Sequence, residues 1–251
     1  MASVSIVIPA YNEESRLPAT LEAILAYLGA SERWSEWEIL VVDDGSTDGT
    51  AAVAERLHRA EPRISLLRNP GNRGKGYSVR HGMLAGKHDW VLFSDADLST
   101  PIEELDRLYD ACRGRDCSVA IASRALDRSL IEERQSLLRE FGGRGMNLLM
   151  RLIVGLDIAD TQCGFKLFTR ESAQAVFPLQ TIEGFGFDPE ALFIARKLGY
   201  RCCEIPVRWK HVEGTKVRLV RDSLRMLADF LRIRANDLAG KYSGQALPAR
   251  V

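Results

Sequence analysis

The sequence predicts an α/β fold built on a mainly parallel sheet with helices on both faces. In the first half of the chain, short apolar runs rich in β-branched residues alternate with stretches of helical periodicity. Strands separated by helices in this way form parallel sheets that are buried on both faces. The composition is globular, since 46% of the 251 residues are hydrophobic and 27% are charged, which excludes collagenous, coiled-coil and disordered chains.

The elements of the first half can be placed in order. Strands are predicted over Val4–Ile8, Glu38–Val42, Ile64–Leu67, Asp89–Phe93 and Ser118–Ala122. Helices are predicted from the spacing of the leucines between Leu17 and Leu28, and over Thr47–Ala60 and Lys75–Gly86. A further helix is expected after Thr100, which forms a capping box as N-cap, with Pro101 at N1 and Glu103 at N3.

The second half is less regular. A helix-rich stretch runs from Leu130 to Leu156, another helix follows Asp188, and a strand lies near Cys203–Val207. The chain closes with an amphipathic helix over about residues 215–241. Because no internal repeat or linker-like segment interrupts this order, we expect residues 1–251 to form a single domain.

Charge and cysteine content exclude several classes of protein. Lys plus Arg and Asp plus Glu both number 34, so we expect no nucleic-acid partner. The five cysteines and four histidines have no metal-binding spacing, which favours a reducing compartment. The N-terminus has no signal-peptide pattern, and the most apolar segment, Leu148–Ile158, is shorter than the ~20 residues of a spanning helix. We therefore expect a soluble or membrane-surface protein.

Candidate ligand contacts follow the predicted strands, because open parallel sheets bind ligands beyond the carboxyl ends of their strands. The residues in these places are Pro9, Ala10, Tyr11, Asn12 and Glu13 after the first strand, Asp43, Asp44 and Gly45 after the second, Ser94, Asp95, Ala96 and Asp97 after the fourth, and Ser123 and Arg124 after the fifth.

Asp95 and Asp97 form the most informative pair. Two carboxylates one residue apart at a strand end can bind one hard cation, such as Mg²⁺ or Mn²⁺, and hold it against a diphosphate. The alternative is an ordinary solvated turn, but the position at the ligand-binding edge favours the metal.

Two loops near this edge have alternative interpretations. Counting from Asp44, the segment nearly matches a calcium loop, but Ser46 stands at position 3 and a buried strand precedes it. Contact of its carboxylates with a base or ribose is the better interpretation. Asn69–Gly76 is a glycine-rich loop that can approach a phosphate group, to which Lys75 would add a positive charge. The alternative is that this segment is an ordinary tight turn. Cys163 is expected to be a small buried residue and not a nucleophile.

The C-terminal helix has a charged stripe and a wide apolar arc. At 100° per residue, an arc of about 100° contains Arg218, Arg221, Asp222, Arg225, Asp229 and Arg232. The helix either packs on its own domain with a solvated charged face, or lies on a membrane surface, or does both. On a membrane, the four arginines are expected to contact anionic headgroups.

Four of these segments, in this order, resemble the motifs of glycosyltransferase family 2, whose members have the nucleotide-diphospho-sugar transferase (GT-A) fold. They are Ile8–Glu14, Val42–Thr50, Asn72–Gly76 and Ser94–Asp97. Asp160–Phe168 (DTQCGFKLF) and His211–Lys216 (HVEGTK) resemble the dolichyl-phosphate β-glucosyltransferase branch and, less closely, the dolichyl-phosphate mannose synthases. The resemblance covers about residues 3–240.

The resemblance implies roles for the matching residues. Donor contacts are implied for Pro9, Ala10, Tyr11, Glu13, Asp43, Asp44, Lys75, Asp95, Ala96, Asp97 and Lys216. Of these, Asp95 and Asp97 would bind Mg²⁺ or Mn²⁺, and Lys216 would close over the diphosphate. Arg124 and Arg144 would hold the phosphate of a lipid acceptor. The implied catalytic residues are Asp97, Asp188 and Lys216.

The expected function is an inverting, metal-dependent transfer of a sugar, glucose from UDP-glucose, to a polyprenyl phosphate. The acceptor phosphate is already anionic and needs no general base. The alternatives are a GDP-mannose donor, a hydroxyl acceptor with Asp188 as base, or a non-catalytic nucleotide- or calcium-binding protein. The expected location is cytoplasmic, with peripheral contact at the cytoplasmic face of a membrane.

Overall fold

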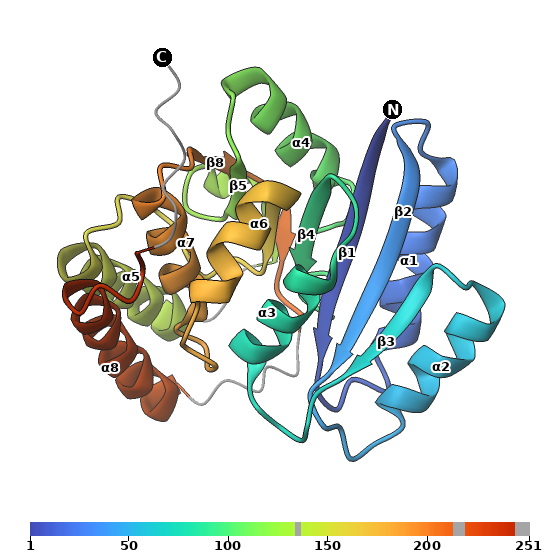
Figure 1. Ribbon diagram of the computed structural model, residues 1–251, viewed down its shortest axis with the longest axis horizontal. Coiled ribbons are helices and arrows are strands. Elements are labelled where there is room, and N and C mark those ends of the chain that lie inside the picture. Colours follow the sequence, from blue (N-terminus) through green and yellow to red (C-terminus); the bar gives the residue numbers. More distant parts are fainter. Residues whose placement is uncertain (134–136, 213–218, 244–251) are drawn as a thin grey trace.

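The centre of the computed structural model, which describes residues 1–133, 137–212 and 219–243, is a seven-stranded sheet with the order β3-β2-β1-β4-β7-β5-β8 (Figure 1). The strands are β1 (Ala2–Ala10), β2 (Trp34–Asp43), β3 (Ile64–Arg68), β4 (Trp90–Ser94), β5 (Val119–Ser123), β7 (Phe165–Thr169) and β8 (Cys202–Pro206). Neighbouring strands are parallel except that β7 runs antiparallel to β4 and β5. The predicted mainly parallel sheet is confirmed. β6 (Ile131–Glu133) and β9 (Trp209–Lys210) form a separate parallel pair.

Helices cover both faces of the sheet. One face carries α1 (Leu17–Ala30), α2 (Thr50–Ala60) and α4 (Glu104–Arg115). The other carries α3 (Lys75–Ala85), α5 (Leu137–Val154), α6 (Arg170–Val176), α7 (Phe187–Lys197) and α8 (Leu219–Leu238). Short 3₁₀ turns occupy Arg128–Leu130 and Phe177–Leu179. In the described residues, no helix combines the length and apolar character that a membrane crossing requires.

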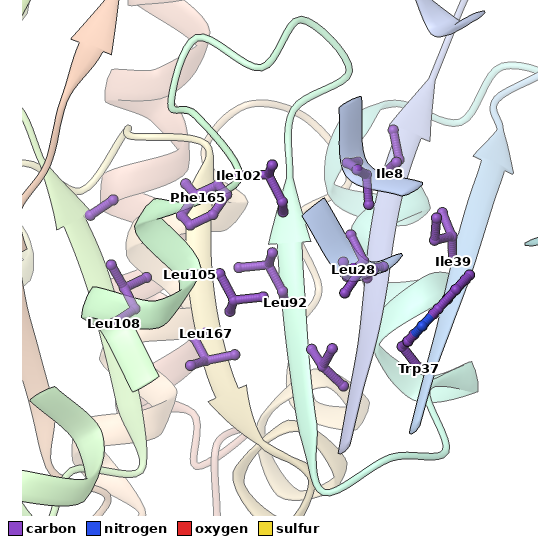
Figure 2. Close-up of a cluster of buried hydrophobic side chains, with 14 of the residues drawn as sticks. Ile8, Leu28, Trp37, Ile39, Leu92, Ile102, Leu105, Leu108, Phe165 and Leu167 are labelled. Atoms are coloured by element: carbon purple, nitrogen blue, oxygen red, sulfur yellow. The ribbon is translucent and has the colours of Figure 1, made fainter. Parts of the chain in front are cut away.

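The alternation of side chains along each strand divides the core into two layers. Ile6 and Ile8 of β1 are buried beneath the first group of helices, whereas Val7 is buried with the second. Figure 2 shows the first layer, where Leu92 of β4 lies with Leu105 of α4. Each such leucine contributes about 1.5–3 kcal/mol through burial. This packing fixes the strands so that β1, β2, β4 and β5 end at one edge.

Two local features differ from expectation. Strand β7 was not predicted, although its residues lie in the DTQCGFKLF segment. The prediction of a capping box at Thr100 is wrong, because α4 begins only at Glu104. The buried Thr100 hydroxyl does not cap the helix and lies 3.6 Å from Cys163 Sγ. Cys117, just before β5, lies beside Cys203 of β8, with their Cα atoms 6.1 Å apart.

Candidate active site

A cleft of about 1230 Å³ lies at the predicted edge of the sheet. It is lined by residues that follow β1 and β4, by the start of α3, by residues 181–185 and by one side of α8. The sequence-predicted residues that it brings together are Pro9, Ala10, Tyr11, Glu13, Asp44, Lys75, Asp95, Ala96 and Asp97. Asp43 does not line it, because that carboxylate is buried and accepts a hydrogen bond from the Ser46 amide at 3.1 Å.

Two further predicted residues cannot be placed against the cleft. Lys216 lies outside the described residues. Arg144 lies on α5, but its side chain is outside the described part of the structure.

The Asp44 carboxylate organises the glycine-rich loop. It accepts hydrogen bonds from the backbone amides of Arg73 at 2.9 Å and Gly74 at 2.8 Å, and from the Asn69 amide group at 2.8 Å. Gly45 has a left-handed φ of 71°, which residues other than glycine rarely adopt. Because Asp44 already accepts three hydrogen bonds, this geometry gives no support to the calcium-loop alternative.

Asp95 lies between Lys75 and the start of β7. The Lys75 ammonium is 2.6 Å from Asp95 Oδ1 and 5.3 Å from the centre of the Phe93 ring. Burial alone would lower the pKa of Lys75, but the surrounding carboxylates, Asp95 first, raise it. The Asp95 amide donates to the Gly164 carbonyl at 2.9 Å, and a Cβ on Gly164 would collide with the Asp95 carboxylate. The glycine of the DTQCG segment therefore makes room for this carboxylate.

The donor set of Asp95 and Asp97 fits a hard divalent cation. Both side chains line the cleft, and Asp97 Oδ1 accepts a hydrogen bond from the Ser99 amide at 3.0 Å. Within the described residues, no group of three or more His, Cys, Asp or Glu side chains could enclose a metal. Two carboxylates suit Mg²⁺, which commonly takes its other ligands from substrate phosphates and water.

A smaller cavity of about 230 Å³ adjoins the cleft and shares Lys75, Asp95 and Asp97 with it. Arg124, Gln162, Asp188, Trp209 and His211 are among the residues that complete its lining. The two cavities meet at the pair of carboxylates. This arrangement can hold one ligand in each cavity, with both ligands beside the carboxylate pair.

Arg124 is held in a fixed orientation in the smaller cavity. Its Nε and Nη2 donate to Asp160 at 2.6 and 2.8 Å, and its guanidinium lies 5.4 Å from the Trp209 ring centre. Burial alone would lower the pKa of Arg124, but Asp160 raises it further above its usual range. Asp160 is held in turn by its backbone amide, which donates to Glu204 at 2.8 Å. These bonds do not use Nη1, which can meet an anion.

Asp188 forms a buried ion pair with Lys166 of β7. Both side chains are at most 4% exposed, and Lys166 also donates to the Cys163 carbonyl at 2.6 Å. Burial raises the pKa of Asp188 in spite of Lys166 and Lys75. Asp188 is thus a counter-ion for a lysine that sequence reasoning missed. The available signal was a single charge between the apolar residues Phe165 and Leu167.

Cys163 is buried, as expected. Burial raises the pKa of its thiol to about 11, so the thiol stays protonated near neutral pH and is a poor nucleophile.

Helix α8 presents three different sides. Phe230 and Ile233 are buried against the second layer of the core. Arg225, Asp229 and Arg232 line the large cleft. Leu224, Leu231 and Leu238 are 65%, 58% and 83% exposed and share one face, because seven residues make about two turns. Arg225 and Arg232 thus border the cleft, and their contact with headgroups stays a prediction, while Arg218 and the Arg221 side chain lie outside the described residues.

The fold has close counterparts among solved structures. Glucosyl-3-phosphoglycerate synthase of Mycobacterium tuberculosis matches with a TM-score of 0.66 and 21% identity over 92% of this chain and 80% of that one. Mannosyl-3-phosphoglycerate synthase of Rubrobacter xylanophilus matches with a TM-score of 0.67 and 19% identity over 100% and 79% of the two chains. These likenesses show the GT-A fold.

Similar sequences have a more specific description. A dolichyl-phosphate beta-glucosyltransferase of Trichomonas vaginalis is 38% identical over 92% of this chain and 72% of its own length. The enzymes of the same name from Drosophila melanogaster and Homo sapiens are 38% and 34% identical, each over 95% of this chain and over 76% and 77% of their own lengths. The model of the family described as "Glycosyl transferase family 2" matches residues 5–177. The chain therefore belongs to glycosyltransferase family 2 and is a glycosyltransferase.

Proposed function

We propose that this glycosyltransferase moves glucose from UDP-glucose to a polyprenyl phosphate such as dolichyl phosphate, with inversion at the anomeric carbon. The observation that carries this proposal is the shared wall of the two cavities, where Asp95 and Asp97 face both the cleft and the pocket of Arg124. The names of the relatives support the sugar and the acceptor. The neighbouring synthase crystallised with Mn²⁺ and UDP supports the nucleotide and the metal.

In this proposal the large cleft holds the nucleotide sugar. Pro9, Ala10, Tyr11 and Glu13 line the end proposed for the base and ribose, and Lys75 lies beside the carboxylates proposed for the diphosphate. Asp95 and Asp97 would hold Mg²⁺ or Mn²⁺. When bound, such a cation would offset negative charge on the leaving diphosphate.

The smaller cavity would hold the acceptor phosphate against Arg124. A phosphate oxygen attacks the anomeric carbon while the bond to the diphosphate breaks on the opposite side, which converts an α-linked donor to a β-linked product. No proton needs to move, because the acceptor is already an anion. The hydroxyl-acceptor alternative requires a base, and Asp188 is engaged with Lys166.

Incubation of the purified protein and Mg²⁺ with labelled nucleotide sugars and polyprenyl phosphate tests the proposal. We expect label from UDP-glucose in the organic phase and none when the acceptor is the corresponding prenyl alcohol. Transfer from GDP-mannose in preference to UDP-glucose would overturn the donor assignment. Transfer to the alcohol would overturn the acceptor assignment.

Substitution Arg124→Ala is expected to weaken use of the acceptor by about 10- to 100-fold in kcat/KM, because a charge-assisted hydrogen bond contributes about 1.5–3 kcal/mol. UDP affinity, measured by calorimetry, should stay within about twofold of the wild type. An equal loss of UDP affinity would show that Arg124 serves the donor or the fold instead.

Exposed leucines support a peripheral position on a membrane. Leu148, Leu149 and Leu152 of α5 are 57%, 40% and 72% exposed, and α5 packs beside α8 with its exposed Leu224 and Leu231 (Figure 1). Two neighbouring helices with uncovered leucines suit the apolar part of a lipid surface. We propose that they contact the membrane that carries the acceptor. That this is a cytoplasmic face stays a prediction from the sequence.

The double variant Leu224→Ser/Leu231→Ser is expected to bind vesicles at least tenfold more weakly in a sedimentation assay. Burying one leucine in an apolar medium contributes about 1.5–3 kcal/mol. Turnover of a short, water-soluble prenyl phosphate should change little, because neither leucine lines the large cleft or the smaller cavity beside it. Unchanged sedimentation would remove this face as the membrane contact.

A further inference from the structure

We propose that Arg225 and Arg232 of α8 bind the phosphates of the nucleotide donor, so that the C-terminal helix forms part of the donor site. This inference rests on the proposed function only in taking the large cleft as the place of a nucleoside diphosphate. The sequence pattern suggested a membrane role for these arginines, and none of the motifs at the strand ends includes them.

The placement of the two arginines is the first support. They are seven residues apart, so they share one face of α8, and both are exposed while lining the cleft. Asp229 lies between them on the same face and accepts a hydrogen bond from the Gly186 amide. A Cβ on Gly186 would come within 2.5 Å of the Asp229 side chain. This close contact fixes α8 against the loop of residues 184–186, which also borders the cleft.

The charges of the cleft provide the second support. Three cations in its lining are paired with acids: Arg16 with Glu13 at 2.7 Å, Arg73 with Glu183 at 2.6 Å and Lys75 with Asp95 at 2.6 Å. Neither Arg225 nor Arg232 has a carboxylate within 4.0 Å among the side chains that the structure describes. The α8 arginines thus have charge to offer a ligand.

The balance of charge shows why a diphosphate would need them. The lining contains six carboxylates, those of Glu13, Asp44, Asp95, Asp97, Glu183 and Asp229. Without α8, and so without Asp229, five carboxylates would face three cations, and a nucleoside diphosphate would enter a cleft with two excess negative charges. Arg225 and Arg232 raise the cations to five, leaving one excess negative charge for a divalent cation to reverse.

The outer face of α8 separates this role from membrane binding. Leu224 and Leu231 each precede one of the two arginines by one residue, which turns them about 100° away around the helix. One helix can therefore present arginines to the donor and leucines to lipid.

The test is calorimetric titration of UDP in Mg²⁺ into Arg225→Gln, Arg232→Gln and the double variant. We expect each single variant to weaken UDP binding about 3- to 10-fold and the double variant at least tenfold. The affinity for uridine, which has no phosphate, should not change. Arg234→Gln is the matched control, because it removes the same charge from α8 at a position that does not line the cleft. It should bind UDP like the wild type.

Three outcomes would overturn the inference. These are wild-type UDP affinity in the double variant, an equal loss in Arg234→Gln, or an equal loss of uridine affinity. Vesicle sedimentation of the same variants adds an independent check, since reduced sedimentation with unchanged UDP binding would return the arginines to the membrane. The titration contains no acceptor, so a failure of glucose transfer to polyprenyl phosphate would leave its result intact.

Discussion

Replacement of Asp97 by Asn is expected to reduce sugar transfer by about 10²-fold or more while the protein stays folded. The substitution removes one of the two carboxylates that would hold the divalent cation, and loss of a group that stabilises charge in the transition state has an effect of this size. Asp97 is a sharper probe than Asp95, because Asp95 also forms an ion pair with Lys75. The measurement is the initial rate of transfer at saturating Mg²⁺, beside a thermal melt.

The exposed Asp110, which pairs with Arg33 on the surface, provides a matched control. Asp110→Asn removes the same charge far from the carboxylate pair in the fold and should keep wild-type activity. Near-native turnover of Asp97→Asn would reject the metal assignment. A fall in melting temperature that accounts for the lost activity would reject it as well.

Replacement of Lys166 by Met is expected to lower the free energy of unfolding by about 3–5 kcal/mol. The change leaves the Asp188 carboxylate buried without its ion-pair partner, and an uncompensated buried charge is strongly destabilising. Urea denaturation measures the effect. The exposed pair of Arg68 and Glu55 is the control, since Arg68→Met should cost at most about 1 kcal/mol.

The double variant Lys166→Met/Asp188→Leu separates loss of charge balance from loss of packing. It removes both charges and should recover much of the stability, because apolar replacements of a buried pair are often neutral or stabilising. If the double variant is as unstable as Lys166→Met, the pair does not act through its charges. If Lys166→Met unfolds no more easily than Arg68→Met, the destabilisation argument is wrong.

The strand ends could be predicted because they depend on local pattern. The apolar run Val91, Leu92 and Phe93 predicts a buried strand. The carboxylates that follow this run are therefore expected at the carboxyl edge of the sheet. The same reasoning placed Lys75 at the start of a helix.

Other parts of the site depend on pairing between distant segments, which periodicity does not encode. Strand β7 pairs antiparallel with β4 and β5, and Lys166 on this strand meets Asp188 at the start of α7. For α8, the spacing of Arg225 and Arg232 predicted a shared face but not what that face would meet. Thr100 suited a helix cap by sequence, yet burial beside Cys163 determined its place.

The antiparallel strand β7 also sets a length scale for the reaction. The residues around Asp95 leave the sheet from β4, those around Gly164 enter it at β7, and Arg124 leaves it from β5, which makes three adjacent strands. Neighbouring strands are about 4.8 Å apart, so the ends of β4 and β5 lie roughly 10 Å from each other. The conformation of the loops that follow these strands does not change this separation. The sheet therefore sets the separation between the donor and acceptor groups at two inter-strand spacings, with β7 between them.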